Sequence, residues 1–368
     1  MSDETPNTKQ RFVFNELRRE ILDGRYATGR FTSERSLMKR FAVSRTLVRE
    51  VIRELKFAGY LTCRQGSGTF VTKGARNLGG HIGLIVPGVV HEEIFPPICR
   101  AISDIAQKEG FTLLLGNITE EDGMARARRV KAIVNEFVAQ RVSGVIYQPM
   151  EFLGNSPKVN ADLIALFDRA NIPVVLLDYD IVPPPGRSRY DLVGIDNFEA
   201  GRRLAAHLVS VGAKRIAFML KDNWAFSVLN RLEGVRHVAA EARRLATSPV
   251  LHVEPTDVKA VRAVLHRKNP PDAIVCGNDM VAARLLVTLR KLGVSVPKTV
   301  MVAGFDDVAH AALVEPPLTT VRQPCSDIAR TLFEVLLRRM RDSGCAPVTV
   351  SLNAPLVVRL STKPPRNH

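Results

Sequence analysis

Short, uninterrupted apolar runs recur along most of this chain of 368 residues, and their spacing constrains the fold more than any other feature. Strands that read as continuous apolar runs are buried on both faces, and strands separated by helices pair in parallel. Amphipathic stretches of helix length, such as residues 98–109 and 200–211, lie between most of the runs. We therefore predict an α/β region with parallel sheets, built as one large sheet or two smaller ones. The runs are residues 82–86, 112–115, 144–147, 174–177, 216–220, 273–276 and 300–303.

The first 75 residues follow a different pattern. Apolar residues at four-residue steps predict an amphipathic helix over residues 11–24, ended by a glycine. Ser33 and Ser44 are good N-caps for two further helices, and residues 61–64 and 69–71 read as two strands. Three helices followed by a two-stranded wing form an α+β unit that places its third helix in the major groove of DNA.

The third of these helices carries side chains suited to a polyanion. Arg45, Arg49 and Arg53 recur every four residues and therefore share one face. A basic helix face is more often simply solvated than bound to a partner. Here, however, the helix follows another helix across a tight turn, and its first residues combine small polar groups with a guanidinium. Such groups reach phosphates and base edges.

Three segments of this region, Ser33-Glu34-Arg35, VSRTLVREVIRELKFAGYL and RQGSGTFV, resemble the GntR family of winged helix-turn-helix regulators. The resemblance covers residues 11–73 and implies double-stranded operator DNA as the partner. Thr32 replaces the usual proline, and Leu47 replaces a usual threonine, which suits contact with a thymine methyl group. The expected DNA-binding residues are Arg35, Ser44, Arg45, Thr46, Leu47, Arg49, Gln65 and Gly66.

Polar residues follow several predicted strands of the α/β region. Asp178 ends one run, Asn278 and Asp279 follow another, and Asp306 follows a third. An acidic residue after a strand is often only a helix cap, but ligands of such folds bind at the carboxyl ends of the strands. Carboxylates and arginine bind sugar hydroxyls through charge-assisted hydrogen bonds, with an aromatic ring against the apolar face of the sugar. The set therefore indicates a binding site.

The segments HIGLIVPG, VGIDNFEAGRRLAAHLVSVGAKRIAFM, PPDAIVCGNDMVAA and VPKTVMVAGFDDVAHAALVEPPLTTVRQP resemble the effector domain of LacI/GalR-type repressors. That domain is similar to periplasmic sugar-binding proteins. The resemblance implies two subdomains around a cleft, with three crossovers near residues 190, 305 and 323. By position, the effector-binding residues would be Phe95, Asp178, Trp224, Arg231, Asn278, Asp279 and Asp306.

The two resemblances together imply a chimeric layout, similar to that of arabinose-responsive repressors. We expect a head over residues 1–73, a linker over residues 74–80 and an effector-binding and dimerisation domain over residues 81–363. Within this domain, subdomain one is expected to span about 81–190 and 306–323, and subdomain two about 191–305 and 324–363.

Charge and cysteine usage restrict the partners and the compartment. The formal net charge is +15, and residues 1–75 hold 15 Lys and Arg against 8 Asp and Glu, as a phosphate-seeking module requires. The five cysteines form no CxxC pair, so we expect no disulfide framework, no metal site and a reducing cytoplasm. No apolar run approaches the ~18 residues of a membrane span, and the first residues contain no signal-peptide core.

These features favour a ligand-responsive transcription regulator, expected to be a repressor released by a sugar or sugar derivative. One winged head covers one half-site, so we expect a homodimer on a two-fold operator. The alternative is an α/β enzyme fused to a DNA-binding head. The chain has no Walker A loop, Rossmann glycine fingerprint, nucleophile elbow or HExxH motif, so we expect neither catalytic residues nor a cofactor.

Overall fold

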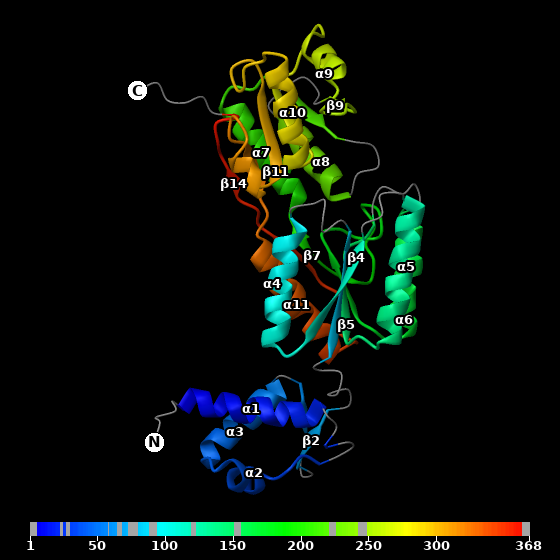
Figure 1. Cartoon of the computed structure of the whole chain (residues 1–368), viewed down its shortest axis with the longest axis vertical. Helices are drawn as coiled ribbons and strands as arrows, with labels where there is room; N and C mark the ends of the chain where they lie inside the picture. Colours follow the sequence, from blue (N-terminus) through cyan, green and yellow to red (C-terminus); the bar gives the residue numbers. More distant parts are fainter. Residues whose placement is uncertain are drawn as a thin grey trace.

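The computed structural model describes residues 6–22, 25–26, 30–57, 59–64, 68–72, 80–87, 94–118, 123–150, 156–220, 226–241 and 249–362. Three layers follow one another along the longest axis, with the N-terminal head at one end (Figure 1). A sheet flanked by helices lies in the middle, and a second such sheet lies at the far end. Within the described ranges, no helix is long and apolar enough to cross a membrane.

The head consists of three helices and a hairpin, as predicted. Both predicted caps are confirmed, because Ser33 Oγ accepts a hydrogen bond from the backbone N of Ser36 and Ser44 Oγ accepts one from that of Leu47, each at 3.2 Å. The three helices enclose one apolar cluster, and the hairpin strands pair antiparallel. The head elements are α1 (Pro6–Leu22), α2 (Glu34–Phe41), α3 (Arg45–Phe57), β1 (Leu61–Arg64) and β2 (Gly68–Val71).

The middle layer is a parallel six-stranded sheet in the order β13-β7-β6-β5-β3-β4, here called sheet one. Its strands are β3 (His81–Pro87), β4 (Thr112–Ile118), β5 (Gly144–Tyr147), β6 (Val174–Leu177), β7 (Asp191–Ile195) and β13 (Thr349–Leu352). Two helices pack on each face, which explains the continuous apolar runs. One face carries α4 (Phe95–Lys108) and α11 (Cys325–Arg341), and the other α5 (Gly123–Ala139) and α6 (Ser156–Arg169).

The far layer is a second six-stranded sheet in the order β14-β12-β11-β10-β8-β9, here called sheet two. Among its described strands, only β14, at the edge, runs antiparallel to its neighbour. The strands are β8 (Ile216–Met219), β9 (Val250–Leu251), β10 (Ala273–Cys276), β11 (Met301–Asp306), β12 (Thr319–Arg322) and β14 (Leu356–Val357). One face carries α7 (Asn197–Ser210) and α8 (Phe226–Glu241), and the other α9 (Val258–Leu265), α10 (Asp279–Lys291) and the short η2 (Ala309–Ala312).

The predicted α/β fold with two smaller sheets is confirmed, but the division of the chain between them needs correction. The crossover predicted near residue 305 is wrong, because β11 and β12 pair directly in parallel, with Ala303 opposite Thr319. Residues 306–322 therefore stay in sheet two. The third crossover lies instead between β13 and β14, so β13 joins sheet one. These strands are too short to carry a pattern that shows which sheet they join.

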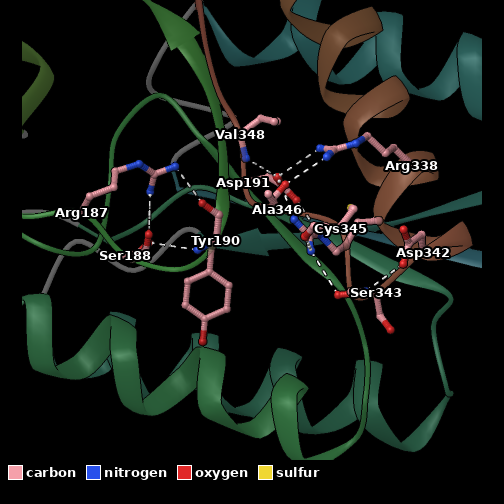
Figure 2. A network of polar contacts seen from close by, with 12 residues as sticks. Arg187, Ser188, Tyr190, Asp191, Arg338, Asp342, Ser343, Cys345, Ala346 and Val348 are labelled. Atoms are coloured by element: carbon pink, nitrogen blue, oxygen red, sulfur yellow. Dashed lines mark hydrogen bonds and ion pairs between the residues drawn. The ribbon is translucent and has the colours of Figure 1, made fainter.

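β7 also belongs to sheet one, although residues 191–195 were predicted to lie in subdomain two. The strand opens with Asp191, a charged residue that interrupts the apolar pattern, yet its side chain is only 1% exposed. The carboxylate accepts hydrogen bonds from Arg339 of α11. It also accepts one from the backbone N of Val348 before β13 (Figure 2). This pairing makes a buried acid tolerable at the start of the strand.

The head touches the middle layer through α1 and α11. Arg18 of α1, 9% exposed, donates from Nε to the Tyr60 hydroxyl at 2.7 Å and from Nη2 to the backbone carbonyl of Glu109, which follows α4. Met340, in the last turn of α11, packs against the apolar cluster of the head. One of the helices that pack on sheet one, α11, is thus in direct contact with the head.

Candidate DNA-binding and effector sites

The start of α3 presents most of the predicted DNA-binding side chains to solvent. Ser44, Arg45, Thr46 and Arg49 are all exposed, as is Arg35 on α2. Groups of this kind, at the N-terminal end of a helix that follows another across a turn, can reach phosphates and base edges.

The other three predicted contacts differ in position. Leu47 is half-buried and packs against the apolar cluster of the head, so it stabilises the fold as well as bordering the exposed surface. Gln65 and Gly66, at the predicted tip of the wing, lie outside the described residues.

Glu34, which belongs to the Ser33-Glu34-Arg35 segment but was not among the expected DNA-binding residues, connects two of the arginines. Its carboxylate lies 3.2 Å from Nε of Arg45 and 3.2 Å from Nε of Arg49. Burial raises the pKa of Glu34, but the hydrogen bonds from the two arginines outweigh it, and the pKa is lowered overall. The carboxylate therefore holds both guanidinium groups together at the start of α3.

The carboxyl ends of the two sheets are joined by a polar cluster centred on Arg231 of α8. This side chain is 4% exposed, and its Nε donates to Asn197 Oδ1 at 2.8 Å while Nη1 donates to the Gly277 carbonyl at 2.9 Å. Nη2 lies 3.5 Å from Asp306 Oδ1. The guanidinium carbon also lies 4.7 Å from the centroid of the Phe305 ring. We call Asp178, Asn197, Ser227, Arg231 and Asp306 the inter-sheet site.

Asp178, at the end of β6, contributes a carboxylate from sheet one to this site. Its Oδ2 accepts a hydrogen bond from Ser227 Oγ at 2.9 Å, which links it to the first turn of α8. The backbone φ of Asp178 is 75°, in the left-handed region that few non-glycine residues adopt. Burial raises the pKa of Asp178, although the nearby charge of Arg231 opposes the rise. Strained backbone of this kind clusters at binding sites.

Asp306 occupies the corresponding position at the end of β11 in sheet two. Its φ is 111°, and Oδ1 accepts a hydrogen bond from Gln323 Nε2 at 3.0 Å. The next residue, Asp307, is used structurally, because Arg322 and Arg359 donate to it at 2.6 and 2.7 Å. Of this acidic pair, only Asp306 joins the inter-sheet site.

Asn278 and Asp279 are fixed by the protein itself. Asn278 Oδ1 caps α10 by accepting from the Val281 N at 3.0 Å. Asp279 is fully buried, and its two oxygens accept hydrogen bonds from Thr320 Oγ1 at 2.6 Å and the Val308 N at 3.1 Å. Burial, and next the charge of Asp306, raises the pKa of Asp279 to about 8. In this conformation Asp279 has no surface to offer a ligand.

Phe95, one of the two predicted aromatic contacts, is not at the inter-sheet site. Phe95 is 4% exposed and packs into the core of sheet one, and Trp224 lies outside the described residues. The half-buried ring of Phe226 adjoins Ser227 and meets Tyr179 edge to face, with centroids 6.2 Å apart. Nothing in the sequence pattern marked Phe226 or Ser227, whereas Asn197 belongs to the DN segment that carried the second resemblance.

Gln148 is a further polar residue missed from the sequence. It follows β5, where the predicted ligand end of sheet one lies, and it is 3% exposed. Its Oε1 has no hydrogen-bond partner within the described part of the chain. A buried amide oxygen without a donor is uncommon and is often found where a ligand or water completes the bonding. Among the described residues there is no group of His, Cys, Asp and Glu that could hold a metal ion.

Two family models match the chain. Residues 9–71 match the gntR family of bacterial regulatory proteins, and residues 205–362 match the periplasmic binding protein-like domain. The arabinose metabolism transcriptional repressor of Geobacillus stearothermophilus is 29% identical, over 90% of this chain and 91% of that protein. The ribose operon repressor of Halalkalibacterium halodurans is 26% identical, over 90% and 93%.

Solved structures of transcriptional regulators share the fold of this chain. The structure of a transcriptional regulator CelR–cellobiose complex is similar with a TM-score of 0.65 and 25% identity, covering 87% of this chain and 91% of that one. A LacI family transcriptional regulator from Enterococcus faecium with bound ribose shares the fold of the two-sheet region, with a TM-score of 0.63 and 23% identity over 77% of this chain and 99% of that one. The chain is therefore a DNA-binding transcriptional regulator that joins a gntR-family head to a periplasmic binding protein-like effector domain.

Proposed function

We propose that this regulator is a repressor whose operator affinity falls when a sugar or sugar derivative binds at the inter-sheet site. The observation that carries the proposal is the position of Arg231, which bonds to Asn197, to Gly277 and to Asp306 at the meeting point of the two sheets. Carboxylates with a fixed guanidinium are suited to bind hydroxyl groups. Relatives of the chain are named as repressors of arabinose metabolism and of the ribose operon.

Each residue of the site has a separate role in this proposal. Asp178 and Asp306 accept hydrogen bonds from ligand hydroxyls, and Arg231 donates to a ligand oxygen. Gln148 Oε1 accepts a further hydroxyl, and the Phe226 ring packs on an apolar face of the sugar. Asp279 acts as a positioning residue that holds the loop after β11. All of these roles are in binding or in positioning.

A path from this site to the head runs through α11. The helix begins two residues after Gln323, whose side chain bonds to Asp306, and Met340 in its last turn packs on the head. A shift of Asp306 on ligand binding would therefore be carried along α11 to the head. The ligand can move this equilibrium only by its different affinity for the two arrangements.

We propose further that the regulator acts as a homodimer in the cytoplasm, where its operator is. Two heads related by a two-fold axis match two half-sites about one helical turn apart. The contact between the Arg18 guanidinium and the Glu109 carbonyl would fix each head relative to its own sheet one. The effector would then change the spacing between heads.

A titration of operator DNA tests the proposal. The operator is first selected from a random duplex library by the full-length protein, and its affinity is measured by fluorescence anisotropy with and without L-arabinose, D-ribose and cellobiose. We expect one sugar to weaken binding at least about tenfold, which corresponds to ~1.4 kcal/mol of coupling. If no sugar in a wider panel of pentoses, hexoses and disaccharides changes the affinity, the proposal is wrong.

Two variants locate the response. Arg231→Lys and Asp178→Asn should bind operator within about twofold of the parent protein but lose the response to the sugar, because each removes a fixed polar partner. Arg236→Lys is the matched control, since Arg236 lies on the same helix, is exposed and pairs only with the nearby Glu233 within the described residues. A retained response in both site variants would place the ligand elsewhere.

A further inference from the structure

A pocket lies at the opposite end of sheet two from the inter-sheet site. Its volume is 350 Å³, and Ile216 at the amino end of β8 forms part of its wall. The inter-sheet site adjoins the carboxyl end of the same sheet, at Gly277 after β10. The two sites are therefore separated by the length of the strands. A pocket of this volume accommodates a small organic molecule.

The pocket is strongly basic. Arg215, Arg267 and Lys268 line it together with Asn269, whose side-chain amide is a further donor, and none of the described residues that line it is acidic. One carboxylate is close to this lining, that of Asp272, whose Oδ2 lies 3.7 Å from Arg215 Nη2. Three cationic groups therefore face one neighbouring acid. The surroundings favour a ligand with more than one negative charge.

The Arg267 guanidinium supplies the second observation. Its Nε donates to the Val264 carbonyl at 3.1 Å, which holds the group at the end of α9. Nη2 is buried and has no hydrogen-bond partner within the described residues. A buried charged donor without an acceptor costs more than a neutral one, so a rotation of the side chain that brings Nη2 to an anionic oxygen in the pocket would be favourable.

The rest of the lining indicates the kind of anion. Ile216 and Pro249 provide apolar wall, which inorganic phosphate would not use, while the four donors match the oxygens of a phosphate group. We propose that this pocket binds a small phosphate monoester, of about the size of a sugar phosphate, as a second ligand of the regulator. The phosphate lies against Arg267, Lys268 and Arg215, and the organic part covers Ile216 and Pro249.

Isothermal titration calorimetry of the full-length protein tests this proposal with three probes: ribose 5-phosphate, inorganic phosphate and ribose. We expect ribose 5-phosphate to bind at least about tenfold more tightly than inorganic phosphate, and to bind more weakly as the sodium chloride concentration rises. Equal affinity for the ester and for inorganic phosphate would overturn the assignment to an ester. Absence of binding by either phosphate at millimolar concentration would overturn the site.

Variants assign any binding to this pocket. Arg267→Gln with Lys268→Gln should weaken binding of ribose 5-phosphate by about tenfold or more, since two charged donors are lost. Lys268→Glu is the second variant: its side chain is exposed, so the fold tolerates the change, and the reversed charge should weaken binding as well.

The matched control is Arg262→Gln, an exposed arginine one turn earlier near the end of α9 and outside the pocket lining. It should bind ribose 5-phosphate with parental affinity. Parental affinity in the double variant, or an equal loss in the control, would contradict the proposal. Because all three changes lie away from the inter-sheet site, they should leave the response to a neutral sugar intact, which separates this test from that of the proposed function.

Discussion

Asp191 of β7 and Arg339 of α11 form a buried ion pair in which both carboxylate oxygens accept hydrogen bonds from the guanidinium, at 2.8 and 3.1 Å. The residues are separated by 148 positions in the chain, and their pairing holds the end of α11 against β7. Figure 2 shows Asp191 beside Arg338, the neighbour of Arg339 on the same helix. The next residue along α11, Met340, contacts the head. The pair thus fixes the last turn of α11, which contacts the head, against sheet one.

Removing this acid should destabilise the effector domain. Asp191→Asn leaves the Arg339 guanidinium without its ionic partner, and breaking a buried pair costs about 3 kcal/mol or more. Thermal unfolding followed by circular dichroism should show a lower melting temperature. Asp327→Asn is the control, since Asp327 is an exposed residue of the same helix whose ion pair with Arg330 is worth less than about 1 kcal/mol. Equal melting temperatures for the two variants would contradict the role given to the pair.

The arginines of the recognition helix should carry much of the operator affinity. Arg45→Ala and Arg49→Ala are each expected to weaken binding by about 1–3 kcal/mol where the arginine contacts a base, with a smaller loss at a phosphate. Anisotropy titrations at several salt concentrations measure both the affinity and the number of phosphate contacts. Lys291→Ala is the control and should leave binding unchanged, since Lys291 is an exposed residue of α10, which packs on sheet two far along the chain from the head. Parental affinity in both arginine variants would exclude α3 as the recognition helix.

The buried carboxyl of Asp279 should make stability depend on pH. Its pKa is raised from 3.8 to about 8, so the folded state holds a proton that the unfolded chain has already lost at neutral pH. The stabilisation from this proton is complete below the unfolded pKa and is lost as the pH rises through the folded one. Urea unfolding should therefore show stability falling by at least about 1 kcal/mol between about pH 5 and pH 9.

Two variants isolate this contribution. Asp279→Asn cannot titrate and should flatten the pH profile. Asp306→Asn removes a charge that raises the Asp279 pKa, and should move the fall in stability to lower pH. If the profile of Asp279→Asn has the same slope as that of the parent protein, another group is responsible.

Gln148 should show opposite effects on stability and on ligand binding. Gln148→Leu removes a buried amide oxygen that lacks a donor within the described residues, so the fold should keep its stability or gain up to about 1 kcal/mol. The same change should weaken binding of the effector by about tenfold relative to the parent protein. Thermal shift without ligand and calorimetry with it measure the two effects. A less stable variant with unchanged ligand affinity would show that Gln148 serves only the fold.

Much of the candidate DNA-binding surface could be predicted from the sequence because it depends on local rules. Ser33 and Ser44 cap their helices as expected, and the four-residue spacing of Arg45 and Arg49 places both on one exposed face. The role of Glu34 could not be predicted in the same way. It lies 11 residues before Arg45, on another helix, and only the packing of α2 on α3 brings the charges together.

The sequence by itself determined the kind of structure, namely a winged head followed by buried parallel strands, because capping and apolar periodicity act over a few residues. Only the tertiary structure decided which sheet each short strand joins, because pairing such as that of β11 with β12 depends on partners far along the chain. It also decided which of the strand-end acids remain accessible. Asp279 and Asp306 look alike in sequence, but the first is enclosed by Thr320 and Val308 while the second faces Arg231 at the meeting point of the sheets.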